Sequence, residues 1–252
     1  MPGDEQQYRR ILGIRFFTGS AAEAVALGLR GGLVVVPSAP VLVGAMEDPA
    51  TQAALLDNDL AITDSGLMIL IWSLLRRERI PRVSGLEYLK LLIAEPSVRG
   101  AGASLWVMPG EAAMERNLAW LRAQGHEISR EDCYVAPKYP PGPLADPALL
   151  EIVERRKPRH IVMAIGGGVQ ERLGHYLKRN ASFRPGIHCT GAAIGFLSGD
   201  QVSIPVWADR FFLGWLFRCV RSPGLFIPRY WKAARLVPMM FRWGARLPQP
   251  AA

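Results

Sequence analysis

The feature that most constrains the fold is an alternation of short apolar runs with longer amphipathic segments over residues 1–204. The apolar runs carry almost no charge and lie at 33–36, 60–63, 104–108, 160–165 and 187–190. Strands that are buried on both faces of a parallel sheet have this pattern. Segments with helical spacing lie between them, at 21–30, 66–79, 111–125 and 145–157. We therefore expect right-handed crossovers and a Rossmann-like α/β fold, with a mostly parallel sheet and flanking helices.

The alternation stops near Pro205, where the composition also changes. The 252-residue chain has a net charge of +8, and residues 205–252 hold eight Lys and Arg against one Asp, which gives 8 − 1 = +7 for this segment alone. The same segment carries four of the seven tryptophans. We predict two helices there, near 208–221 and 228–245, separated by a turn at 222–224. The chain is thus expected to comprise a sheet domain, 1–204, and a basic, aromatic C-terminal appendage, 205–252.

Arginine mixed with Trp, Phe, Leu and Met is typical of helices that lie in a lipid headgroup layer. The alternative is a helical pair that packs on the sheet or on another subunit. Nucleic acid is not expected as a partner, because no recognisable binding motif accompanies the charge. No run reaches the ~18 apolar residues that a membrane-spanning helix needs, and the polar N-terminus shows no secretory signal.

The residues that commonly bind metals do not form a metal site. Three widely spaced cysteines fit neither a disulfide scaffold nor a zinc ribbon and suit a reducing compartment: Cys133, Cys189 and Cys219. The four histidines have no ligand spacing, so we expect satisfied structural roles for them. Asp57-Asn58-Asp59 resembles a metal-binding DxD pair but precedes its strand, at the wrong edge of the sheet.

Asp64 is the strongest catalytic candidate, because it directly follows a predicted strand and precedes a helix that begins near Ser65. A carboxylate at the carboxyl edge of the sheet could act as a general base. The alternative is a helix N-cap, since Asp is a favoured cap residue. The two roles compete, because hydrogen bonds from backbone N–H groups weaken a carboxylate as a base.

Three glycines, 166–168, follow another predicted strand and precede a helix that begins near Val169. Backbone N–H groups at such a helix start suit a phosphate. However, neither GxGxxG nor a Walker lysine is present, so a nucleotide site on this basis is weakly supported. A different Rossmann-type enzyme, such as a methyltransferase, stays an alternative. Glu171, in the first turn of this helix, is more often a partner of the helix dipole than a ligand.

Several segments together resemble the WecG/TagA/CpsF bacterial glycosyltransferases, glycosyltransferase family 26. The resemblance covers nearly the whole chain, and the order and spacing of its fragments carry it. The fragments are TDSGLM at 63–68, RVSGLEYL at 82–89, GGGVQERLGHYL at 166–177, GAAIGFLSGDQVSIPVW at 191–207 and WLFRCVRSPGLFIPRY at 215–230.

The resemblance implies an inverting transfer of a sugar from a UDP-sugar to a polyprenyl-diphosphate-linked saccharide, without a metal or other cofactor. Such an enzyme lies on the cytoplasmic face of the cell membrane and serves capsule, exopolysaccharide or wall-polymer synthesis. It implies Asp64 as the base. The residues implied at the substrate are Arg82, Gln170, Glu171, Ser38 and Ser65, and those implied at the lipid diphosphate are Arg218, Arg221 and Arg229.

This sequence departs from the family pattern mainly on the donor side. Ser65 stands where the family has Gly, Ser38 lies near the place of an Asn, and Gly168 replaces a Pro. The donor sugar is therefore left open among hexoses and N-acetylhexosamines. A non-catalytic member that binds UDP-sugar or lipid-linked glycan as a scaffold subunit is the alternative, and a homo-oligomer is compatible with the pattern.

Overall fold

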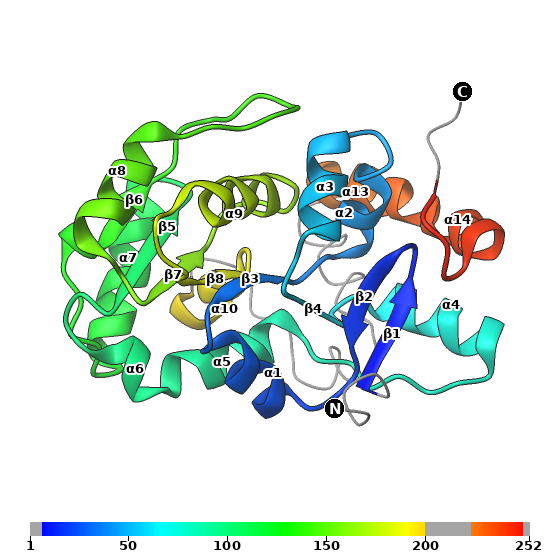
Figure 1. The fold of residues 1–252 in the computed structure, drawn as a ribbon, viewed down its shortest axis with the longest axis horizontal. Coiled ribbons are helices and arrows are strands. Elements are labelled where there is room, and N and C mark those ends of the chain that lie inside the picture. The colour runs from blue at the N-terminus through cyan, green and yellow to red at the C-terminus, as the bar shows by residue number, and fades with distance from the viewer. Residues whose placement is uncertain (1–6, 200–222, 249–252) are drawn as a thin grey trace.

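The computed structural model describes residues 7–199 and 223–248, which form an α/β structure around one eight-stranded sheet (Figure 1). The strand order is β1-β2-β4-β3-β8-β7-β5-β6, and every described pair is parallel except β1 with β2. The strands are β1 Tyr8–Ile11, β2 Ile14–Phe17, β3 Gly32–Val35, β4 Leu60–Ile62, β5 Ser104–Met108, β6 Cys133–Val135, β7 His160–Met163 and β8 Gly186–Cys189. The predicted α/β class and mostly parallel sheet are confirmed, and all five apolar runs contain strands.

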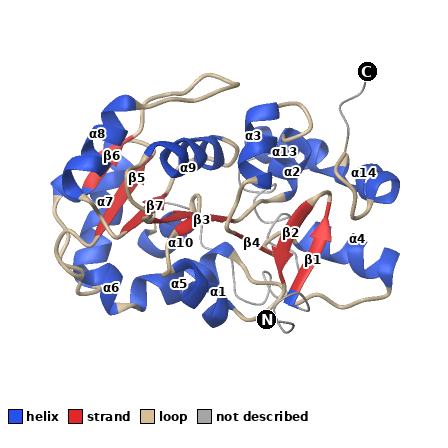
Figure 2. Cartoon of the chain, viewed as in Figure 1, coloured by secondary structure: helices blue, strands red, loops and turns tan. Residues whose placement is uncertain are grey.

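Helices cover both faces of the sheet (Figure 2). One face carries α2 Ala39–Gly44, α3 Pro49–Leu56, α4 Gly66–Arg76, α8 Pro147–Arg156, α9 Val169–Asn180, α13 Pro223–Ala234 and α14 Leu236–Trp243. The other face carries α1 Ala21–Gly28, α5 Gly85–Ala94, α6 Pro96–Arg99, α7 Glu111–Ala123 and α10 Ala193–Ser198. A 3₁₀ turn, Arg130–Asp132, precedes β6.

Alternate residues of each central strand enter opposite halves of the core, as the two-residue period of a strand requires. In β3, Leu33 and Val35 pack under α2 and α9, whereas Val34 packs under α1 and α5. All four residues of β3 are buried. This two-sided burial explains why the central strands are continuous apolar runs in the sequence.

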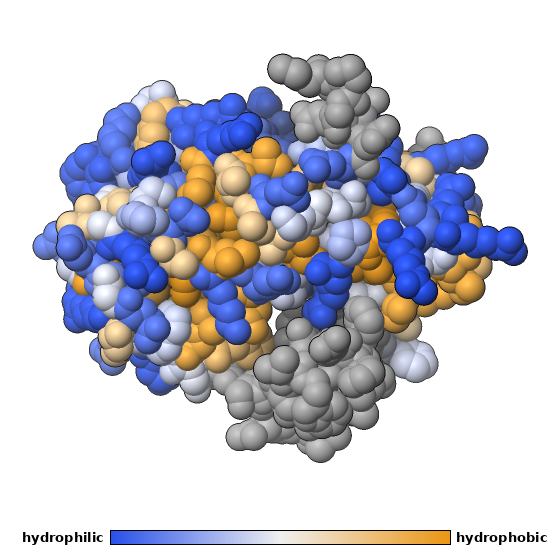
Figure 3. Space-filling view, turned by 90° about the horizontal axis from the view of Figure 1, so that it is seen from below, coloured by the Kyte–Doolittle hydropathy of each residue, from blue (hydrophilic) through white to orange (hydrophobic). Residues whose placement is uncertain are grey.

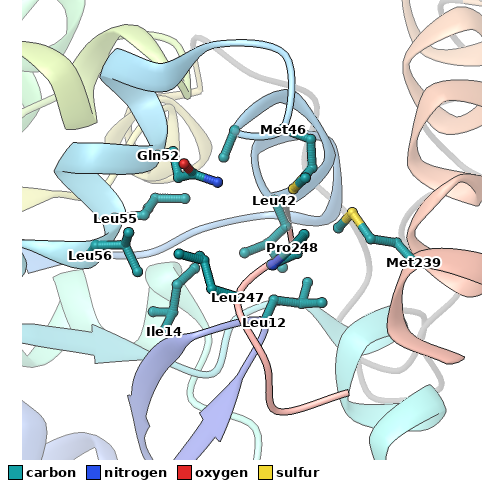
Figure 4. A pocket seen from close by; sticks show the side chains of 11 residues that line it. Leu12, Ile14, Leu42, Met46, Gln52, Leu55, Leu56, Met239, Leu247 and Pro248 are labelled. Atoms are coloured by element: carbon teal, nitrogen blue, oxygen red, sulfur yellow. The ribbon is translucent and has the colours of Figure 1, made fainter. Parts of the chain in front are cut away.

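The described C-terminal segment shares the core of the sheet domain. Ala233, Leu236 and Met240 are buried in the same cluster as α2 and α4. The segment also accepts backbone hydrogen bonds from the β1–β2 turn, where the N–H of Leu12 donates to Gly244. Leu247 lines a small apolar groove with residues of α2, α3 and that turn (Figure 4). Packing on the sheet, one of the two alternatives for this segment, is thus confirmed for 223–248, and membrane contact stays a prediction.

The predicted helix over 228–245 is wrong in its limits, because it is two helices, α13 and α14. Pro238 has no N–H to donate and its ring would clash with the carbonyl four residues earlier, so α13 ends at Ala234. The predicted turn at 222–224 is also wrong from Pro223 onward, where α13 begins. Proline is favoured at a first helical position. The helix predicted at 208–221 lies outside the described residues, and among the described helices none has the length and apolarity to cross a bilayer.

Candidate functional site

The carboxyl edge of the sheet has a topological switch point between β3 and β8. β3 leads into α2 on one face, whereas β8 leads toward α10 on the other. Chains that leave neighbouring strands in opposite directions open a crevice, which is where open α/β sheets bind ligands. The predicted site residues leave from β4, β3 and β7, which lie beside this crevice.

Asp64 lies at the exit of β4 and is half-buried. Its Oδ1 accepts a hydrogen bond of 2.9 Å from the N–H of Gly85, at the first residue of α5. The side chain that caps α4 is Ser65, whose Oγ accepts from the N–H of Met68 at 3.3 Å. The alternative for Asp64, an N-cap of the helix that follows its own strand, is therefore wrong, because Ser65 occupies that role and Asp64 contacts the start of a different helix.

Arg82 is brought to Asp64 by the loop that returns from α4. Thr63 is buried and holds this loop, since its Oγ1 donates to the carbonyl of Pro81 at 2.7 Å and accepts from the N–H of Val83 at 3.4 Å. Arg82 lies between these two anchors, and its Nε donates to the carbonyl of Asp64 at 3.0 Å. The structure thus brings together the predicted base, the predicted arginine and Ser65.

Gly85 joins this cluster to the crevice. A Cβ added there would lie 2.9 Å from Val36 Cγ1 and 3.9 Å from the carbonyl oxygen of Thr190. These two residues follow β3 and β8, so the start of α5 lies directly against both strand exits. A side chain at this position would displace Val36, which gives a physical reason for glycine there.

Gln170 and Glu171 organise the other side of the crevice. Gln170 is buried; its Oε1 accepts from the N–H of Gly191 at 2.8 Å and its Nε2 donates to Glu171 at 3.0 Å. Glu171 has no exposed surface, and its Oε2 accepts from the N–H of Gly168 at 2.5 Å. These contacts tie the exit of β7 to the exit of β8. The dipole-partner interpretation of Glu171 fits this geometry, and direct contact of either side chain with a substrate stays a prediction.

Burial dominates the electrostatics of this side. It raises the pKa of the Glu171 carboxyl above its ordinary value, against the opposing effect of hydrogen bonds from Gln170 and Gly168. Burial also raises the pKa of the neighbouring Cys189 thiol, whose Sγ donates to the carbonyl of Gln170. Cys189 is consequently an inert core thiol rather than a nucleophile.

Arg172 is a residue that the sequence reasoning missed. Its buried guanidinium donates to the carbonyls of Pro140 and Gly142 and, from Nε, to the carbonyl of Gly168 at 3.3 Å. It also lies 3.5 Å from the carboxylate of Asp48. Arg172 therefore holds the proline-rich loop at 139–143 against the glycine turn. In the sequence Arg172 directly follows Gln170 and Glu171, and this position was the signal from which its place at the site could have been predicted.

Ser38 lies at the exit of β3, next to the crevice, and is half-buried. It is the N-cap residue of α2, but its hydroxyl makes no capping hydrogen bond. The glycine turn approaches the same helix, since a Cβ on Gly167 would lie 2.6 Å from Val41 Cγ2. Ser38 is thus placed between the Asp64 cluster and the glycine turn.

The described part of the structure does not include the side chains of the predicted appendage arginines. Arg218 and Arg221 lie outside the described residues, and the side chain of Arg229 in α13 does too. Their predicted contact with a lipid diphosphate stays a prediction.

The Asp57–Asp59 segment lies before β4, at the opposite edge, as expected. Asp57 pairs with Lys178, and Asp59 pairs with Lys178 and Arg184. In residues 7–199 and 223–248, no group of three or more His, Cys, Asp or Glu could hold a metal ion.

Two of the histidines form a buried chain beneath the crevice. Tyr88 Oη lies 2.8 Å from His188 Nδ1, and His188 Nε2 lies 3.2 Å from His160 Nδ1. His188 is satisfied, as predicted. The prediction fails for His126, where neither buried ring nitrogen has a hydrogen-bond partner in the described structure, and for Nε2 of His160.

The fold is thus an α/β structure with a mostly parallel sheet, and a carboxylate, an arginine and glycine turns lie at the carboxyl edge, which is where sheets of this kind bind ligands. The sequence model of the Glycosyl transferase WecG/TagA/CpsF family matches residues 9–250, nearly the whole chain. The protein therefore belongs to this family, whose glycosyltransferases serve the synthesis of wall and capsule polymers. A comparison with curated proteins found no match.

Proposed function

We propose that the protein transfers a hexose or N-acetylhexosamine from a UDP-sugar to a polyprenyl-diphosphate-linked saccharide, with inversion at the anomeric carbon. The observation that carries the proposal is the position of Asp64. Asp64 stands at the carboxyl edge, one strand away from the switch-point crevice, and its backbone carbonyl accepts a hydrogen bond from Arg82. Family membership supplies the reaction class.

In this mechanism the Asp64 carboxylate takes the proton of the acceptor hydroxyl as that oxygen attacks the anomeric carbon. The bond from that carbon to the UDP oxygen breaks, and UDP leaves with the electron pair. The N–H of Gly85 donates to the Asp64 carboxylate and keeps it in place. Arg82, whose Nε donates to the carbonyl of Asp64, would offset the charge on the departing diphosphate.

The donor would lie across the exits of β3 and β8. Three strand spacings of about 4.8 Å separate β4 from β7, so roughly 14 Å lies between the strand exits from which Asp64 and Gln170 leave. This span suits a sugar diphosphate. Ser38 lies within it, and Gln170 and Glu171 fix the backbone of its far wall. The appendage arginines and the membrane surface would serve the lipid-linked acceptor on the cytoplasmic face.

The test measures UDP release by the full chain with liposomes, a lipid-diphosphate-linked sugar acceptor and a panel of UDP-sugars. Asp64→Asn keeps an oxygen that can accept from Gly85, so the fold should persist while the base is lost. We expect a loss of about 10²–10⁴-fold in acceptor-dependent release. Asp57→Asn is the matched control, because it makes the same change at the opposite edge, where the carboxylate is half-exposed.

Activity that survives Asp64→Asn would remove Asp64 as the base. UDP binding without release from any donor would favour the non-catalytic scaffold instead.

A further inference from the structure

The helix α4 has an apolar face that no other described element covers. Its inner face is buried through Met68, Ile69, Ile71 and Trp72. On its outer face, Leu70 is 52% exposed and Leu74, one turn later, is 73% exposed. A helix that is apolar on all sides belongs in a core or in contact with lipid, because water gives its outer face no favourable environment.

The neighbouring C-terminal helix α14 extends this apolar surface. α14 packs beside α4, and a Cβ on Gly244 would lie 3.4 Å from Nη2 of Arg76. Phe241 on α14 is 57% exposed. Figure 3 shows hydrophobic side chains at the surface of the end of the molecule that carries α4, with hydrophilic side chains around them.

Arginines accompany the apolar residues on both helices. Arg76, Arg77 and Arg79 are exposed at the end of α4, and Arg242 and Arg246 are exposed at the end of α14. Glu78 lies among the first group, but it accepts from Arg9 and from Trp72 Nε1. No Asp or Glu occurs after Asp209. The rim is therefore strongly positive.

We infer that α4 of the sheet domain, together with α14, inserts into an anionic lipid surface, so that membrane contact is not confined to the C-terminal segment. Exposed Leu and Phe would enter the acyl boundary while arginines pair with lipid phosphates. A second copy of the chain fits this surface less well, because a two-fold contact would bring the arginines of both copies together.

The position of α4 gives this contact a consequence for the site. α4 begins at Gly66, two residues after Asp64, and Leu70 lies about 6 Å further along the helix axis at ~1.5 Å per residue. A bilayer on this face would hold a lipid-linked acceptor close to the predicted base. This consequence rests on the proposed function, whereas the lipid contact itself does not.

The test is partition of the full chain onto phosphatidylglycerol-containing vesicles and onto pure phosphatidylcholine vesicles. The double variant Leu70→Gln/Leu74→Gln should bind at least about tenfold more weakly to both. Leu91→Gln is the matched control, because Leu91 is an exposed leucine on α5, outside this surface. It should bind like the wild type.

A second variant, Arg77→Asn/Arg79→Gln, tests the charge. Arg77 has φ +54°, which asparagine tolerates. We expect about fivefold weaker binding per arginine on anionic vesicles and no change on neutral ones.

Unchanged vesicle binding of the Leu70→Gln/Leu74→Gln variant would overturn the inference. A wild-type dimer that this variant converts to monomers would also overturn it, because the surface would then bind a second copy of the chain. Vesicle binding that depends on α4 in a protein that releases no UDP would instead uphold the surface and refute the proposed transferase.

Discussion

The buried histidine chain predicts that the protein loses stability in mildly acidic solution. His160 and His188 have no exposed surface, and their facing nitrogens lie 3.2 Å apart. Burial lowers the pKa of His188 to about 3 and that of His160 to about 4. In the unfolded chain both would titrate near 6.5.

Because the folded pKa values lie below the unfolded ones, the native state binds fewer protons than the unfolded state at acidic pH. The stabilising effect is fully present above about pH 6.5 and is lost as the pH falls toward the folded values. A pH of about 5 lies roughly 1.5 units below the pKa of the unfolded imidazole, and each unit corresponds to about 1.4 kcal/mol. At this pH each histidine thus lowers the free energy of unfolding by about 2 kcal/mol, and the pair lowers it by about 4 kcal/mol. This is a large part of the ~5–15 kcal/mol that is typical for the free energy of unfolding of a native protein.

Urea denaturation at about pH 7.5 and pH 5 tests this prediction. The wild type should lose about 4 kcal/mol between the two conditions, and His160→Asn, which keeps a group near the Nδ1 position, should lose about 2 kcal/mol. Tyr88→Phe is the control: it removes the bond to His188 and should cost about 1–3 kcal/mol at both pH values. Glu171, with its raised pKa, acts in the opposite direction, but equally in all three proteins. Equal losses in the wild type and His160→Asn would refute the reasoning.

Three further predictions concern the edge of the sheet. Gln170→Ala removes one of the two acceptors of the Gly191 N–H, which also donates to the carbonyl of Met163 at 3.0 Å, and one donor to the buried Glu171, so the free energy of unfolding should fall by about 1–3 kcal/mol in urea denaturation; an unchanged free energy would contradict the network. Ser65→Ala should cost about 1 kcal/mol and Ser65→Gly only a few tenths, read as shifts in Tm; equal shifts would show that the cap contributes nothing. Gly168→Ala places a side chain at φ +87° and should cost about 1–3 kcal/mol by chemical denaturation, and an unchanged midpoint would argue against backbone strain there.

The central strands could be predicted from the sequence because burial on both faces leaves an apolar run, whereas the edge strands could not. β1 and β2 mix arginine with apolar residues without a regular two-residue alternation, and the turn that joins them is Leu12–Gly13 rather than a common hairpin pair. Leu12 adopts φ +50°, and its N–H donates to Gly244. The C-terminal segment thus supports the turn, which no local pattern reveals. β6 has three residues at the other edge, too few for a periodic signal.

For the site, the sequence could predict which residues reach the carboxyl edge but not what each contacts there. Asp64 and Arg82 are 18 positions apart, and the hydroxyl of Thr63 that joins their loops gives no sequence signal. The burial of Gln170 likewise depends on Gly191, which arrives on a different strand. Contacts of this kind follow from the order of strands in the sheet, which periodicity does not determine.

Neighbouring contacts explain two departures from the family pattern, Ser65 and Gly168. These contacts bear on the alternative that the protein is a non-catalytic member of the family. Ser65, in the place of a glycine, caps α4 and so leaves the Asp64 carboxylate to the start of α5. Gly168, in the place of a proline, has φ +87°, which a proline ring locked near −65° cannot adopt. Its carbonyl accepts from Arg172, whose guanidinium also holds the proline-rich loop. Both substitutions thus belong to ordered hydrogen-bond networks, whereas neutral decay would leave polar groups unmatched. The changes favour an altered donor site over a lost one, which is why the screen should span several UDP-sugars.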